Sequence, residues 1–148
     1  MTQIIQNSQD RFNTLVRSTL EFQDEDFELE TDEEYARVLE HIEKHTYFVN
    51  RIIPVHSPRD GVYSWYQRVY EPIMSWIDRL HLYPYLQNDS GLGTRGQLYL
   101  AICDHWHYLQ ENGKRKIHPK KAVYSFALHR ITNPWVKLLF RLRRKMVL

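Results

Sequence analysis

Residues 31–50, TDEEYARVLEHIEKHTYFVN, carry the clearest structural signal in the chain. Thr31 and Glu34 have the spacing of a capping box, in which the hydroxyl and the carboxylate each accept a hydrogen bond from a backbone N–H. Behind them, apolar side chains recur at helical spacing. We therefore predict a long helix whose buried face consists of Tyr35, Val38, Leu39, Ile42, Phe48 and Val49.

Similar helix starts recur along the chain, and each is followed by apolar residues at helical spacing; they lie at Ser8, Ser57-Pro58, Thr94 with Gln97, Pro119 and Asn133-Pro134. Pro72 falls inside such a pattern and removes one helical hydrogen bond, so that helix should bend or divide near Val69. We find no alternation typical of strands, and the periodicity indicates no internal repeat.

The predicted fold class is therefore all-α: a single compact bundle of roughly five to seven helices, one of them kinked near Pro72. Residues 1–130 are expected to form the helical domain. Residues 131–148 are expected to form a basic amphipathic helix, docked on the same domain.

Composition limits the class of protein. The chain has 148 residues, of which 43% are hydrophobic, enough for one domain with a core. No apolar run approaches the roughly 20 residues that span a bilayer, and the first residues do not resemble a secretory signal. The single cysteine, Cys103, excludes an internal disulfide. These features favour a cytoplasmic protein.

The net charge of +2 conceals a strong asymmetry. Residues 1–111 contain all 18 acidic residues and 9 basic ones, whereas residues 112–148 contain 11 basic residues and no acidic one. Such a division indicates a polyanionic partner, although it is also compatible with a solvated charged surface. Opposite poles on one chain also permit a homo-oligomer.

The predicted anion-binding residues lie in this basic part: Lys114, Arg115, Lys116, Lys120, Lys121, Lys137, Arg141, Arg144 and Lys145. The last helix adds an apolar side formed by Trp135, Leu138, Leu139, Leu142 and Met146. Three interpretations stay open: a helix docked on its own domain, a nucleic-acid contact, or an interfacial helix on an anionic membrane.

Histidines provide the one candidate metal site. His41 and His45 are four residues apart on one helix face, and His105 lies on the inward side of a later helix. If the three converge, they could bind Zn²⁺ or Fe²⁺ and support a metal-dependent enzyme. They can equally be core histidines hydrogen-bonded to neighbouring polar groups.

Other motifs carry less chemistry. Residues 91–96, GLGTRG, match the dinucleotide fingerprint literally, but no strand precedes them, so a loop followed by a helix cap is the expected structure. Cys103 has Asp104 beside it, which opposes thiolate formation. No catalytic residue is assigned.

Several segments resemble a known type of region. Residues 40–48 (EHIEKHTYF), 64–73 (SWYQRVYEPI) and 97–100 (QLYL), together with His105, are similar to the helical region that follows a ParB-like, sulfiredoxin-like domain in uncharacterised bacterial proteins. Such proteins are often labelled transcriptional regulators. This chain shows no ParB-like domain, so the resemblance implies only the accessory helical module, without the nuclease, nucleotide or DNA activity of that domain.

The sequence as a whole favours a non-catalytic helical interaction protein. Its basic C-terminal region would engage nucleic acid or an acidic protein surface. A metal-dependent enzyme using His41, His45 and His105 is the first alternative, and peripheral membrane association through the last helix is the second.

Overall fold

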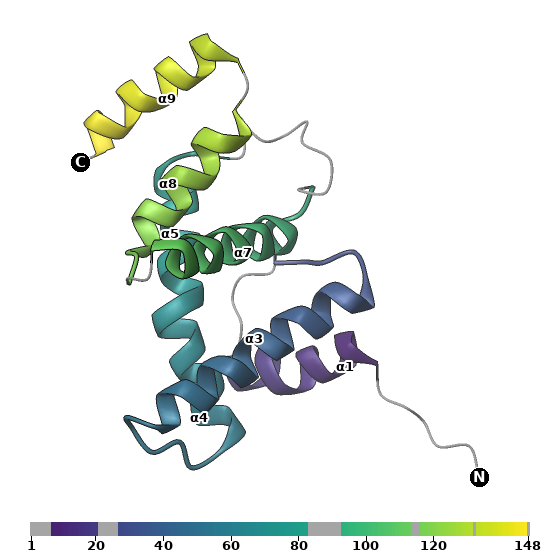
Figure 1. Cartoon of the computed structure of the whole chain (residues 1–148). Helices are drawn as coiled ribbons and strands as arrows, with labels where there is room; N and C mark the ends of the chain where they lie inside the picture. The colour runs from purple at the N-terminus through teal and green to yellow at the C-terminus, as the bar shows by residue number, and fades with distance from the viewer. Residues whose placement is uncertain (1–6, 21–26, 83–92, 114–115, 132, 148) are drawn as a thin grey trace. The chain divides into compact units, whose positions relative to one another are not determined.

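The computed structural model describes residues 7–20, 27–82, 93–113, 116–131 and 133–147, with side chains described as far as Leu142 (Figure 1). Within these ranges all regular structure is helical and no strand occurs, which confirms the all-α prediction. None of the helices in these ranges is both long and apolar enough to cross a membrane. The chain forms two compact units: unit 1 is Met1–Val69 with Thr94–Gln97, and unit 2 is Tyr70–Gly93 with Leu98–Leu148.

Unit 1 contains α1 (Ser8–Phe12), a π-helical segment (Asn13–Arg17), α2 (Ser18–Leu20), α3 (Asp32–Asn50) and α4 (Pro58–Trp65). The N-cap of α1 is Asn7, whose side chain accepts from the Asp10 N–H at 2.8 Å, so the prediction of Ser8 as the cap is wrong by one residue. Both residue types cap helices well, and the backbone leaves the helical conformation at Asn7.

Helix α3 begins with the predicted capping box. The Glu34 N–H donates to Thr31 Oγ1 at 3.2 Å, and the Thr31 N–H donates to Glu34 Oε1 at 2.9 Å. The predicted inward face is confirmed from Tyr35 to Ile42, all buried. Phe48 contradicts the prediction: it is 60% exposed, because it does not continue the three- and four-residue spacing that places Val38 and Ile42 on the buried face.

The core of unit 1 is aromatic. The Phe12 ring lies 5.8 Å from Phe27 and 5.4 Å from Tyr35, centroid to centroid. Gly96 joins this core through its backbone, because its N–H donates to the Glu28 carbonyl at 3.1 Å. A side chain at Gly96 would collide with that carbonyl, so close packing explains the third glycine of the literal fingerprint.

Pro72 divides its helix as predicted. Helix α4 passes into a π-helical segment, Tyr66–Tyr70, and α5 (Glu71–Arg79) follows with Pro72 in its first turn. Pro72 has no N–H to donate, and the wider π turn accommodates the missing helical hydrogen bond and the proline ring.

Unit 2 contains α5, α7 (Arg95–Gly113, whose first turn belongs to unit 1), α8 (Pro119–Arg130) and α9 (Pro134–Val147). Thr94 and Gln97 form the predicted reciprocal cap of α7, at 3.1 and 3.2 Å. The Asn133 side chain caps α9 by accepting from the Trp135 N–H at 2.9 Å. Buried apolar residues from α5, α7 and α8, such as Ile77, Ile102 and Val123, make the core of this unit.

Candidate functional site

The predicted metal-binding histidines lie in different units. His41 and His45 are half-buried on α3 in unit 1, and His105 is half-buried on α7 in unit 2. His45 Nε2 is hydrogen-bonded to the Ser64 hydroxyl on α4, with 2.9 Å between the two atoms. This bond joins the two helices and engages one of the two ring nitrogens of His45.

His105 makes the matching bond in unit 2. Its Nε2 lies 2.9 Å from the Ser125 hydroxyl on α8, and its ring packs edge-on against Phe126 with 5.9 Å between centroids. His129 packs on the same imidazole, and its Nδ1–H donates to the Ser125 carbonyl at 2.7 Å. His105 is thus fixed by α8 on several sides.

Both environments disfavour a charged imidazole. Burial lowers the pKa of His45 below its ordinary value; nearby Arg68 lowers it further, while the backbone of Ser64 opposes the shift. Burial is also the main cause that lowers the pKa of His105, and His129 and Arg130 add to it. Both imidazoles are therefore held toward the neutral form, in which one ring nitrogen donates and the other accepts a hydrogen bond.

No group of three or more His, Cys, Asp and Glu side chains in the described ranges is arranged to hold a metal ion. The site of His41, His45 and His105 therefore stays a prediction, as do Zn²⁺ and Fe²⁺.

The two His–Ser bonds coincide with a short sequence match. Val62-Tyr63-Ser64-Trp65 in α4 corresponds to Val123-Tyr124-Ser125-Phe126 in α8, and a proline precedes each serine by six residues. Burial matches as well, since Val62, Trp65, Val123 and Phe126 are all at most 3% exposed. We interpret this match of three identical residues and one aromatic exchange as a short internal repeat, which the sequence analysis did not expect. Helical periodicity is common to all these segments and does not distinguish a repeat, whereas the shared tetrapeptide does.

A second hydrogen bond repeats with the first. Asn50, near the end of α3, accepts from the Val55 N–H through Oδ1 at 2.8 Å. Gln110, near the end of α7, accepts from the Ile117 N–H through Oε1 at 3.3 Å. Each unit thus has a capped helix of 19 residues, an amide that fixes the following loop, and a proline-initiated helix tied back by histidine and serine. Sequence reasoning missed Ser64, Ser125, Asn50 and Gln110, although the repeated tetrapeptide was the available signal.

The predicted anion-binding residues lie in unit 2. Lys116 and Lys121 are exposed, and Lys120 is half-buried with its ammonium 4.8 Å from the centre of the Trp76 ring. On α9, Lys137 is half-buried and Arg141 is exposed. Lys114 and Arg115 lie outside the described residues, and so do the side chains of Arg144 and Lys145.

These cations are not neutralised locally. Across the described part of the chain, the side chains of Lys116, Lys120, Lys121, Lys137 and Arg141 form no ion pair with a carboxylate. The charge division also follows the two units. Unit 1 has 13 carboxylates against 8 lysines and arginines, a net charge of −5, whereas unit 2 has 5 against 12, a net charge of +7.

Helix α9 is anchored by a residue that the sequence analysis did not single out. Phe140 is 1% exposed and stacks on Tyr124 of α8, with 5.3 Å between ring centroids. Trp135, Leu138, Leu139 and Leu142, the predicted apolar side, are 46–75% exposed. These four side chains are therefore not buried against the domain, and the side chain of Met146, the fifth member of the predicted side, lies outside the described residues. Helix α9 has apolar side chains on two sides, and the side that packs on the domain is the one that carries Phe140.

Comparison with family models, with curated proteins and with solved structures found no match to this chain. The resemblance to the region that follows ParB-like domains therefore stays a prediction, and the site is interpreted from its own geometry.

Proposed function

We propose that this protein is a non-catalytic helical interaction protein whose cationic unit 2 binds a polyanion, nucleic acid being the class that the charges fit best. The observation that carries this proposal is that the exposed cations Lys116, Lys121 and Arg141 of unit 2 form no ion pair within the described part of the chain. Phosphate contacts by lysine and arginine supply most sequence-independent affinity for nucleic acid, because binding releases condensed counterions.

The geometry of unit 2 suits phosphate contacts rather than base recognition. The lysines lie on the loop before α8, on the first turn of α8 and on α9, and Lys120 is partly held by its stacking on Trp76. Positive charges spread over several elements in this way can contact successive phosphates along a nucleic-acid backbone. Lysines, which predominate among the described cations, act as point charges on phosphate, so we expect binding with weak sequence preference.

The test is fluorescence anisotropy of a labelled nucleic-acid duplex titrated with the full chain over a range of salt concentrations. We expect affinity to fall steeply as salt rises. The double variant Lys116→Glu/Lys121→Glu should weaken binding. It should also make the slope of log affinity against log salt concentration shallower by about 2, one unit for each lost phosphate contact.

The matched control is Arg51→Glu/Arg59→Glu, which changes the net charge by the same amount on two exposed residues of unit 1. This control should bind nearly as well as the wild type. If both double variants weaken binding equally, net charge rather than unit 2 is responsible. If the protein does not bind the duplex at low salt but floats with anionic vesicles, the membrane alternative replaces this function. The exposed apolar side of α9 leaves that alternative open.

A further inference from the structure

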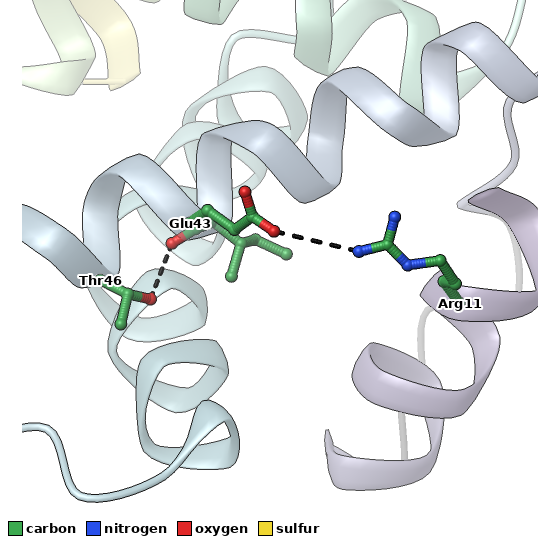
Figure 2. A network of polar contacts seen from close by, with 4 residues as sticks. Arg11, Glu43 and Thr46 are labelled. Atoms are coloured by element: carbon green, nitrogen blue, oxygen red, sulfur yellow. Dashed lines mark hydrogen bonds and ion pairs between the residues drawn. The ribbon is translucent and has the colours of Figure 1, made fainter.

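Unit 1 contains an open pocket of about 670 Å³, a size typical of ligand-binding clefts. It lies between α1, α3 and the loop that precedes α4, and Leu15, Ile42, Thr46, Val55 and Pro58 line it with apolar surface. Figure 2 shows its charged edge, where Arg11 Nη2 of α1 lies 3.9 Å from Glu43 Oε1 of α3.

The internal repeat shows what fills the corresponding place in unit 2. His45 and His105 hold equivalent positions, because each bonds to the serine of the repeated tetrapeptide. The next residue is Thr46 in unit 1 and Trp106 in unit 2. The Trp106 indole N–H donates to the Ile117 carbonyl at 2.8 Å, so the ring spans the gap between α7 and the loop before α8.

Thr46 cannot span the equivalent gap. Its hydroxyl turns back to its own helix and donates to the Ile42 carbonyl at 2.7 Å (Figure 2). Val55 is the equivalent of Ile117, and among the described groups none donates to its carbonyl. The pocket therefore has the size, the apolar lining and the acceptor for an indole, but no indole of its own unit.

Another part of the same chain offers a suitable ring. Of the four tryptophans, Trp135 on α9 is the one with a largely exposed side chain, at 75%. It is accompanied by exposed Leu138 and Leu139, and the helix that carries it holds no acidic residue. The pocket belongs to the acidic unit. Its edge carries both Glu43 and Arg11, so the charge that favours the approach of α9 is the net negative charge of α3, which begins with Asp32, Glu33 and Glu34.

We propose that the unit 1 pocket binds Trp135 of a second copy of this chain, with the cationic helix α9 lying along acidic α3. Tryptophan anchors seated in pockets dominate the affinity of many interfaces. The contact joins the pocket of one copy to helix α9 of another, so the two copies use different surfaces. Its electrostatic part should weaken as salt rises.

The test is sedimentation velocity of the nuclease-treated full chain over a wide range of concentrations at low salt. We expect reversible self-association of the wild type. Trp135→Ala should weaken it at least tenfold, about the loss typical of an interface hot spot. Thr46→Trp should weaken it comparably, because the new indole would occupy the pocket as Trp106 occupies its own.

Mixing these two variants distinguishes contact between copies from contact within one chain. Thr46→Trp retains Trp135, and Trp135→Ala retains an open pocket, so a mixture should associate although neither variant does so alone. A mixture that stays monomeric would overturn the proposal, as would a monomeric wild type.

A second substitution guards against a misfolded Thr46→Trp. Glu43→Lys changes a side chain that is 73% exposed at the edge of the pocket, and it should weaken association. Glu111→Lys reverses the same charge on an exposed residue of unit 2 and should leave association unchanged. Equal effects of the two reversals would contradict a contact at the pocket.

Discussion

The two units share an order of helices and two hydrogen bonds, but they differ in charge and in the residue that follows the bridging histidine. His45 with Ser64, and His105 with Ser125, tie a long helix to the next one in the same way. Unit 1 combines this frame with an acidic surface and an open pocket at Thr46, whereas unit 2 combines it with a cationic surface and fills the place with Trp106. The comparison teaches that shared contacts maintain the fold, while the differences determine what each unit can bind.

The largest expected effect tests whether the repeated aromatic position is equivalent in the two units. Trp65→Ala and Phe126→Ala should each reduce the free energy of unfolding by about 3–5 kcal/mol, because both side chains are at most 3% exposed. Trp135→Ala is the control: its side chain is 75% exposed, so its effect should stay within about 0.5 kcal/mol. Denaturant unfolding followed by circular dichroism measures all three. A large loss at one repeated position and none at the other would break the comparison.

A smaller effect concerns the two His–Ser bonds. Ser64→Ala and Ser125→Ala should each cost about 1 kcal/mol in the free energy of unfolding, because each leaves a half-buried imidazole nitrogen without its partner. Ser18→Ala, at an exposed helical serine, should cost close to nothing. The same denaturation assay applies. Costs equal to that of the control would show that these bonds do not hold the helices together.

The smallest effect is a dependence of stability on pH. The folded-state pKa of His45 and of His105 lies below the ordinary value of 6.5, so the folded protein binds these protons less readily than the unfolded chain. Their contribution is fully present above about pH 6.5 and is lost as the pH falls through the lowered pKa values. The free energy of unfolding should therefore decrease on acidification, and the double variant His45→Gln/His105→Gln should show a shallower decrease. An unchanged slope in that variant would rule out this contribution.

Local features of this fold could be predicted because neighbouring residues determine them. The capping box at Thr31, the reciprocal cap at Thr94 and the start of α8 at Pro119 depend on side chains within a few positions of the backbone groups they satisfy. The interruption before Pro72 follows from the missing N–H of one residue.

Features that depend on distant partners could not be predicted in this way. Helix α9 has apolar residues on two sides, and only packing against Tyr124 selects Phe140 as the buried one. The similarity was hidden because the loops before the two proline-initiated helices differ in length: Asn50 lies 14 residues before Ser64, whereas Gln110 lies 15 residues before Ser125. Ser57 caps α4, whereas His118 caps α8 by accepting from the Lys120 N–H through Nδ1.

The central claim is that the cationic unit, and not the acidic one, binds the polyanion. The most direct measurement is a titration of the isotope-labelled full chain with a nucleic-acid duplex, followed by backbone amide NMR. We predict shifts concentrated at residues 116–142 and small changes across residues 27–69. Shifts centred on α3 and α4, or none at low salt, would contradict the account.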